Sequence, residues 1–137
     1  MDAAATRPGS SPPRVLLVED DAAIRHFVEM ALEDMPLTLV ACPTLARARA
    51  ELAAAPAALV LLDMMLPDGS GLQLLEQERR RPGAPAGTHW VLFSASMSPV
   101  LQNDLAELGI HQVLVKPVTL RALLACVQSA LLAYAGS

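Results

Sequence analysis

The sequence contains little cysteine and no long apolar run, and each of these absences excludes a class of protein. Its two cysteines, Cys42 and Cys126, lie far apart and in no Cys-x-x-Cys spacing, so neither a metal knuckle nor a redox pair is indicated. We expect both to behave as small hydrophobic residues. No apolar stretch approaches the roughly 20 residues of a membrane span, and the N-terminus lacks the charged and then apolar layout of a secretory signal. The sequence therefore predicts a cytoplasmic protein with no membrane partner.

Clustered positive charge is also scarce. Ten Lys and Arg stand against fourteen Asp and Glu, which gives a formal net charge of −4. Phosphate binding needs clustered basic residues, and ten dispersed ones do not supply them, so no nucleic-acid partner is expected. The one basic run, Arg-Arg-Arg at 79–81, follows a stretch of helical period. Because cations are favoured at the negative end of a helix dipole, we expect this run to form a solvated helix C-terminus.

With 137 residues, of which 53% are hydrophobic, the chain has the size of one domain with a substantial core. Residues 1–13 are rich in Ala, Pro, Ser and Gly without an apolar period, which is typical of a flexible tail. We expect one domain over residues 14–134 and a short C-terminal tail over residues 135–137. No segment resembles an output domain, and the sequence leaves open whether this is a stand-alone protein or part of a longer one.

Short apolar runs alternate along the chain with longer segments of helical period. The runs are RVLLV (14–18), LTLVA (37–41), ALVLL (58–62), WVLF (90–93) and QVLV (112–115). Helices are predicted after the cap Asp21, from Thr44 to Ala55, from Ser70 to Arg80, after Ser98 with Gly109 as its end, and after Thr119. In the last helix we expect a stripe to pack on the sheet, formed by Leu120, Leu123, Leu124, Val127 and Leu131. Strands that are apolar on both faces are typical of parallel strands covered by helices on both sides. The sequence therefore predicts an α/β fold, a doubly wound five-stranded parallel sheet with five helices.

Polar side chains follow four of the five apolar runs at the point where each run ends. In chain order they are Glu19 and Asp20, Asp63, Ser94 and Lys116. Taken singly, each has an ordinary structural explanation; Asp63, for example, suits a turn. However, ligands of an open parallel sheet bind beyond the carboxyl ends of its strands. The coincidence of all four runs at one edge therefore predicts a functional site.

The residue types at this edge indicate metal and phosphoryl chemistry. Clustered carboxylates repel one another unless a cation neutralises them, and oxygen ligands without His or Cys favour Mg²⁺. A lysine beside such a site suggests a second anion, because an ammonium and a metal ion together can hold the oxygens of a phosphoryl group. The carboxylate that faces both is a candidate nucleophile.

Together with the stretch DMMLPDGSG (63–71) and the pair Lys116–Pro117, these residues resemble the response-regulator receiver domain of two-component signalling, in its single-domain, chemotaxis-regulator-like form. The resemblance covers residues 14 to about 134 and implies the flavodoxin-like receiver fold. It also implies that Asp63 accepts a phosphoryl group from a phosphohistidine. The donor would be a sensor histidine kinase or a histidine phosphotransfer protein.

The resemblance assigns a role to each residue of the site. Mg²⁺ would be held by Asp20, Asp63 and the main-chain carbonyl of Met65, with Glu19 bound through water. Lys116 would pair with the phosphoryl oxygens, Ser94 would hydrogen-bond to them and move, and the Lys116–Pro117 peptide would be cis. Such a protein is not an enzyme in the usual sense, although it catalyses its own phosphotransfer and dephosphorylation. It would switch the binding of a downstream protein partner as a monomer or weak homodimer.

One position departs from the family pattern, and two other functions remain to be compared. Receivers similar to this one often carry Tyr or Phe three residues before the lysine, where this chain has Val113, so the aromatic switch is absent. A phosphatase resembling the haloacid dehalogenases would need a second Asp as general acid two residues after Asp63, a position that Met65 occupies. A receiver-like interaction module without phosphorylation would show the loss of a site residue, and none is lost.

Overall fold

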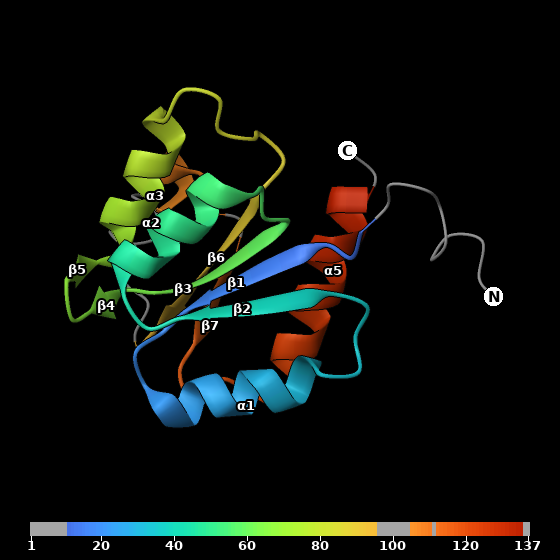
Figure 1. Cartoon of the computed structure of the whole chain (residues 1–137). Helices are drawn as coiled ribbons and strands as arrows, with labels where there is room; N and C mark the ends of the chain where they lie inside the picture. Colours follow the sequence, from blue (N-terminus) through green and yellow to red (C-terminus); the bar gives the residue numbers. More distant parts are fainter. Residues whose placement is uncertain (1–10, 96–104, 111, 136–137) are drawn as a thin grey trace.

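A computed structural model of the chain describes residues 11–95, 105–110 and 112–135 (Figure 1). The main strands are β1 (Arg14–Val18), β2 (Thr38–Cys42), β3 (Leu59–Asp63), β6 (His89–Ser94) and β7 (Gln112–Val115). The helices are α1 (Ala22–Leu32), α2 (Leu45–Ala54), α3 (Gly71–Arg80) and α5 (Leu120–Ala135), and residues 105–108 are also helical. A small antiparallel hairpin consists of β4 (Met65–Leu66) and β5 (Gly69–Ser70).

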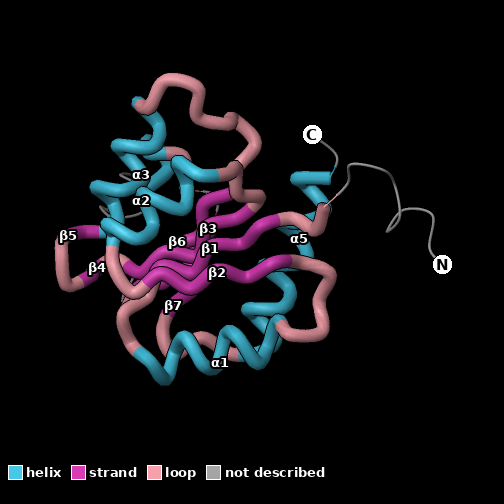
Figure 2. Tube along the Cα trace, in the orientation of Figure 1, coloured by secondary structure: helices cyan, strands magenta, loops and turns pink. Residues whose placement is uncertain are grey.

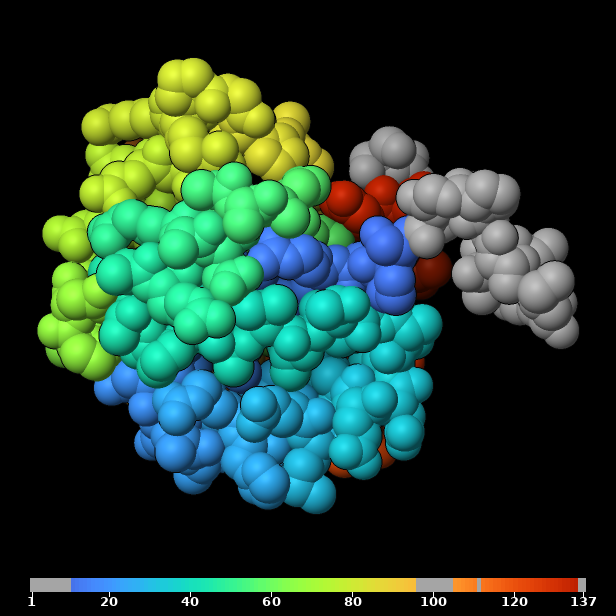
Figure 3. All heavy atoms as spheres, viewed as in Figure 1, coloured from blue at the N-terminus to red at the C-terminus, as the bar shows by residue number. Residues whose placement is uncertain are grey.

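The main strands form one parallel sheet in the order β2-β1-β3-β6-β7, and helices cover both of its faces. In Figures 1 and 2, α1 and α5 lie on one side of this sheet and α2 and α3 on the other. In the space-filling view the atoms of α2 lie above those of the edge strand β2, and the blue atoms of α1 lie below them (Figure 3). The predicted doubly wound α/β fold is confirmed.

Alternate residues of each strand supply two separate cores, because successive side chains of a strand point to opposite faces. Leu16 and Val18 of β1 pack with α2 and α3, whereas Val15 and Leu17 pack with α1 and α5. β3 is buried over its whole length. A strand that supplies both cores in this way must be apolar at every position, which is why the runs in the sequence do not alternate.

The predicted helix boundaries are confirmed by their caps. The Asp21 carboxylate accepts hydrogen bonds from the Ala23 and Ile24 N–H groups, and the Thr44 hydroxyl accepts one from Arg47. The helical stretch 105–108 ends at Gly109, whose φ of +83° is a left-handed conformation that favours glycine. The predicted start of this helix after Ser98 lies outside the described residues.

The stripe predicted for the last helix is wrong at one position. Leu120 is 51% exposed, whereas Leu123 and Val127 are buried as expected. The residues that complete the buried face of α5 are the small ones Cys126 and Ala130. The edge strand β7 also departs from the two-sided apolar expectation, since its Val115 is 50% exposed.

The cysteines behave as predicted, and the arginine run does so in part. Both thiols are buried, and burial raises the pKa of Cys42 and of Cys126 to about 11, so both remain protonated. Arg79 and Arg80 lie in the last turn of α3. Arg79 is also a specific contact, because its Nη1 donates a 2.9 Å hydrogen bond to the Glu107 carbonyl. Among the residues described, no helix is long and apolar enough to span a membrane.

Candidate functional site

The structure brings the residues predicted from four strand ends to one edge of the sheet. Glu19 directly follows β1, Asp63 ends β3, Ser94 ends β6 and Lys116 directly follows β7. Glu19, Asp63 and Ser94 are buried, with 1%, 8% and 3% exposure. β3 pairs with β1 on one side and with β6 on the other, so Asp63 occupies the middle of this edge.

Three carboxylates form a cluster at this edge. One oxygen of each of Glu19, Asp20 and Asp63 lies within 4.8 Å of an oxygen of the other two. Unlike Glu19, Asp20 is exposed, so the cluster opens to solvent on its side. At such separations like charges repel strongly, and the arrangement is stable only with a proton or a cation among the oxygens.

The Lys116 ammonium supplies part of that positive charge. Its Nζ lies 3.1 Å from Asp63 Oδ1, with which it forms a hydrogen bond, and 3.1 Å from Glu19 Oε1. The contact with Glu19 is an ion pair rather than a hydrogen bond, and this buried oxygen has no hydrogen-bond donor among the described residues. Lys116 therefore bridges the central and the most buried carboxylate of the cluster.

The surroundings of Glu19 and Lys116 shift their pKa values in the same direction. Burial raises the pKa of Glu19 from 4.5 to about 7, and the hydrogen bond and negative charge of Asp63 add to the increase. Burial alone would lower the pKa of Lys116, but the hydrogen bond to Asp63 and the negative charges of Glu19 and Asp63 outweigh it and leave this pKa raised. Lys116 is thus a cation at neutral pH, while Glu19 is close to its own titration point.

The donor set fits Mg²⁺. It consists of oxygens only, it is acidic, and it contains a buried carboxylate oxygen without a hydrogen-bond donor in the described part of the chain. Met65, the predicted source of a carbonyl ligand, lies in β4, two residues after Asp63, and its side chain is 79% exposed. The exposed side chain leaves the main chain of Met65 as the part available to the site.

Ser94 and Lys116 are linked to each other and to the residue that follows Asp63. The Lys116 N–H donates a 2.7 Å hydrogen bond to the Ser94 carbonyl. The Ser94 hydroxyl donates to the Met64 sulfur, 3.7 Å away. The Lys116–Pro117 peptide is cis, as the resemblance implied.

Arg25 is a residue at this edge that the sequence did not identify. From α1 its Nη1 donates hydrogen bonds to the main-chain carbonyls of Glu19, at 3.1 Å, and Asp20, at 2.8 Å. It fixes the backbone that carries two of the three carboxylates and adds positive charge beside them. The sequence indicates this role only weakly, because Arg25 is a single basic residue in the first turn of a helix.

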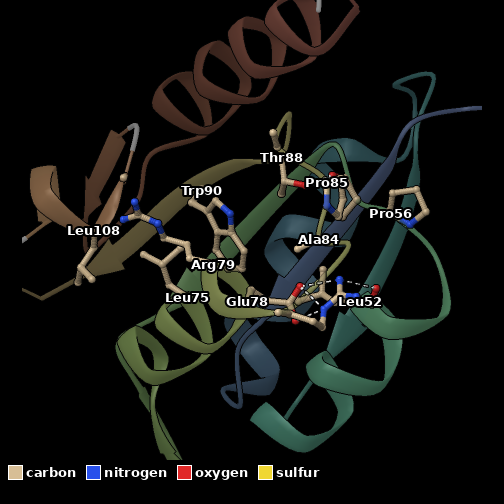
Figure 4. Close-up of a pocket in the computed structure, with 14 residues that line it drawn as sticks. Leu52, Pro56, Leu75, Glu78, Arg79, Ala84, Pro85, Thr88, Trp90 and Leu108 are labelled. Atoms are coloured by element: carbon tan, nitrogen blue, oxygen red, sulfur yellow. Dashed lines mark hydrogen bonds and ion pairs between the residues drawn. The ribbon is translucent and has the colours of Figure 1, made fainter.

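A separate hollow of about 360 Å³ lies at the opposite edge of the sheet, at the starts of the strands. Trp90, Leu75 and Arg79 line one part of it (Figure 4), and Glu78 and Arg81, which form an ion pair, also line it. Trp90 belongs to β6 and lies four residues before Ser94. At about 3.3 Å per residue, this places the indole roughly 13 Å from the carboxylate edge along the strand.

Because of this separation, Mg²⁺ binding is expected to leave the intrinsic fluorescence of Trp90, the only tryptophan, nearly unchanged. The measurement is a Mg²⁺ titration followed at tryptophan emission, with Asp20→Ala as the control variant. Strong quenching in the wild type that disappears in Asp20→Ala would show that the ion acts on the far end of β6.

The fold and the residues at this edge define the class of protein. The chain belongs to the response regulator receiver domain family, whose family model matches residues 15–128. Domains of this family are signalling domains of two-component systems rather than enzymes in the usual sense, and they generally use Mg²⁺. The recognition from sequence is thereby confirmed.

Two curated proteins are similar to this chain in sequence. The chain is 35% identical over 122 residues to the response regulator protein PilR of Pseudomonas aeruginosa and 32% identical over 103 residues to the KDP operon transcriptional regulatory protein KdpE of Escherichia coli. These alignments cover 88% and 75% of this chain. However, they span only 26% of PilR and 44% of KdpE, so the chain matches less than half of either relative.

Solved structures agree with the assignment. A CheY-like response regulator receiver domain protein from Methanospirillum hungatei superimposes with a TM-score of 0.80 at 27% identity, covering 92% of this chain and 98% of its own. The receiver domain of an HD domain-containing protein from Pseudomonas fluorescens gives a TM-score of 0.80 at 25% identity and covers 93% and 92% of the two chains. The flavodoxin-like receiver fold is therefore confirmed.

Proposed function

We propose that the chain is a phosphoacceptor whose Asp63 carboxylate takes a phosphoryl group from a phosphohistidine of a sensor histidine kinase or a histidine phosphotransfer protein. The N–P bond of the phosphohistidine breaks, an O–P bond forms at Asp63, and the imidazole leaves and takes up a proton from solvent. The observation that supports this most directly is the position of Asp63, which ends the central strand with an ammonium at 3.1 Å and two other carboxylates nearby.

The residues around Asp63 would bind two different charged groups, Mg²⁺ and the phosphoryl group. Asp20, Asp63 and the Met65 carbonyl would hold Mg²⁺, with Glu19 bound through water. When bound, the ion supplies positive charge that offsets both the carboxylates and the incoming phosphoryl oxygens. Lys116, now on Asp63 Oδ1, is close enough to move its hydrogen bond to a phosphoryl oxygen.

Ser94 is suited to change partner when a phosphoryl group arrives. In the present state its hydroxyl donates to the Met64 sulfur, and a thioether is a weak acceptor. A phosphoryl oxygen is a much stronger acceptor, which favours a turn of the hydroxyl toward it. We propose that this movement alters the binding of a downstream protein partner. The protein would be cytoplasmic, a monomer or weak homodimer, and would bind no nucleic acid.

The site offers less support to the other functions. An interaction module without phosphorylation would not need an ammonium, a hydroxyl and three carboxylates at one edge. An aspartyl phosphatase would need a proton donor at position 65, where the thioether side chain of Met65 points into solvent with 79% exposure. Phosphoryl acceptance accounts for every residue of the group.

The test is covalent labelling followed by intact-mass spectrometry. With acetyl phosphate and Mg²⁺ the wild type is expected to gain one phosphoryl group that is labile to acid and to hydroxylamine, and Asp63→Asn is expected to gain none. Asp21→Asn is the matched control, because Asp21 lies in the same acidic segment yet serves as the cap of α1, a role that asparagine also fills. Labelling of Asp63→Asn at the wild-type yield would show that Asp63 is not the acceptor.

A further inference from the structure

Asp68 lies five residues after Asp63, in the turn of the β4–β5 hairpin, yet its carboxylate binds a different element. Oδ1 accepts a 2.9 Å hydrogen bond from the Leu45 N–H, and Oδ2 accepts a 3.0 Å hydrogen bond from the Ala46 N–H. Leu45 and Ala46 are the first two residues of α2. One carboxylate from outside the helix thus accepts hydrogen bonds from the first two N–H groups of α2.

α2 also has a cap of its own, at Thr44. The Thr44 hydroxyl accepts from the Arg47 N–H at 3.1 Å. The first N–H groups of a helix have no partner within it, and here they are divided between a local cap and a distant one. Thr44 and Asp68 therefore serve the same helix end, but only Asp68 ties that end to the hairpin.

Other contacts dock the hairpin at the same place. Leu66 of β4 is 8% exposed and belongs to the same core as Leu45. Gly69 of β5 has a φ of +143°, and a Cβ on it would lie 3.2 Å from Leu45 Cδ1 and 2.6 Å from Gln73 Oε1. The backbone of the hairpin therefore lies against the Leu45 side chain at the start of α2 and against the end of the Gln73 side chain of α3.

The near end of the hairpin follows Asp63 directly along the chain. Met65, the first residue of β4, pairs with Ser70 across the hairpin, and the Gly71 N–H donates a 2.7 Å hydrogen bond to the Met64 carbonyl. The hairpin is only two residues long on each side, so its direction is set by what holds its tip. Asp68 is the charged group at that tip.

We infer that Asp68 is a positioning residue for the Mg²⁺ site: by fixing the hairpin tip to α2, it fixes the direction of the Met65 main-chain carbonyl beside Asp63. This inference rests on the proposed function. Two N–H donors favour the ionised form of Asp68, and its pKa is lowered, chiefly by the hydrogen bond from Leu45. The alternative is that Asp68 only stabilises α2.

Asp68→Ala and Thr44→Ala separate these roles, because each removes one cap from the same helix end. In metal-free protein, amide hydrogen exchange is expected to accelerate at Leu45, at Ala46 and through the hairpin 65–70 in Asp68→Ala. In Thr44→Ala it is expected to accelerate at the start of α2 and not in the hairpin. Equal exchange in the hairpin of the two variants would overturn the inference.

Mg²⁺ binding gives the second measurement. By calorimetry the affinity of Asp68→Ala is expected to fall by about tenfold, as is typical when a residue that orients a metal ligand is removed, and that of Thr44→Ala by less than about twofold. Asp68→Asn, which keeps an oxygen for Leu45, is expected to recover part of the loss. The same loss of affinity in Asp68→Ala and Thr44→Ala would reduce Asp68 to a helix cap.

Phosphorylation kinetics with acetyl phosphate complete the comparison. In Asp68→Ala the half-saturating Mg²⁺ concentration is expected to rise by about the same tenfold, while the rate at saturating Mg²⁺ changes by less than about twofold. A fall in the saturated rate instead would place Asp68 in the chemical step rather than in positioning. If the wild type binds Mg²⁺ but takes no phosphoryl group, the proposed function fails while calorimetry still decides the role of Asp68.

Discussion

Replacing Gly71 by alanine is expected to lower the free energy of unfolding by about 3 kcal/mol and the thermal midpoint by roughly 10 °C. A Cβ on Gly71 would lie 2.1 Å from the main-chain oxygen of Asp63 and 3.0 Å from Cγ of Leu62. Both neighbours belong to β3, which is hydrogen-bonded on both sides. β3 cannot move without disturbing the hydrogen bonds to both neighbouring strands, so α3 would have to move away from Asp63 instead.

Gly83→Ala is the matched control for this substitution. Gly83 has a φ of +80° and no heavy atom within 4 Å of its would-be Cβ, so its replacement costs only backbone strain, about 1 kcal/mol. Thermal melting of both variants and the wild type, without Mg²⁺, measures the difference. If Gly71→Ala melts no lower than Gly83→Ala, the backbone at Gly71, the start of α3, does not lie as close to the Asp63 main-chain oxygen as in the structure.

The acidic site could be predicted from the sequence because its residues lie directly at strand ends. Asp63 and Ser94 end their strands, and Glu19 and Lys116 each follow one by a single residue. Once five apolar runs are read as parallel strands, the connection rule alone gathers these residues at one edge. Their distances, such as the 3.1 Å between Lys116 Nζ and Glu19 Oε1, depend on packing and had no sequence signal.

Arg25 and Asp68 were not predicted because their partners are main-chain atoms. Arg25 binds carbonyls and Asp68 binds N–H groups, and every residue offers such atoms whatever its side chain. The β4–β5 hairpin was missed for a related reason, since strands of two residues are too short to show a period. One position of the α5 stripe was wrong because Leu120 and Cys126 both fit a helical stripe, and only the packing of the helix on the sheet decides which is buried.

In EDTA, the wild type is expected to lose stability as pH rises from about 5 to 8, and Glu19→Gln is expected to remove most of this loss. The pKa of Glu19 is raised from 4.5 to about 7 in the folded protein, chiefly by burial. Between these values the folded state holds a proton that the unfolded state has released, so folding becomes less favourable as pH rises through the window. The effect is on the order of 2–3 kcal/mol for a shift of this size.

Glutamine keeps the shape of the Glu19 side chain and its acceptor oxygen but does not ionise. The measurement is urea unfolding at several pH values between 5 and 8, compared between wild type and variant so that the other titrating groups cancel. Glu29→Gln is the control, because Glu29 is an exposed carboxylate on α1. A pH dependence in Glu19→Gln equal to that of the wild type would place the proton elsewhere in the cluster.

Mg²⁺ is expected to stabilise the wild type more at pH 8 than at pH 5, because a proton on Glu19 removes the negative charge that would hold the ion through water. Glu19→Gln, which has no proton to displace, should show a Mg²⁺ shift in thermal midpoint that is smaller and nearly independent of pH. Asp20→Ala should lose most of the shift at both pH values, since it removes the exposed member of the cluster. A wild-type shift of the same size at pH 5 and pH 8 would mean that the ion binds without displacing a proton, and Glu19 would then not belong to its site.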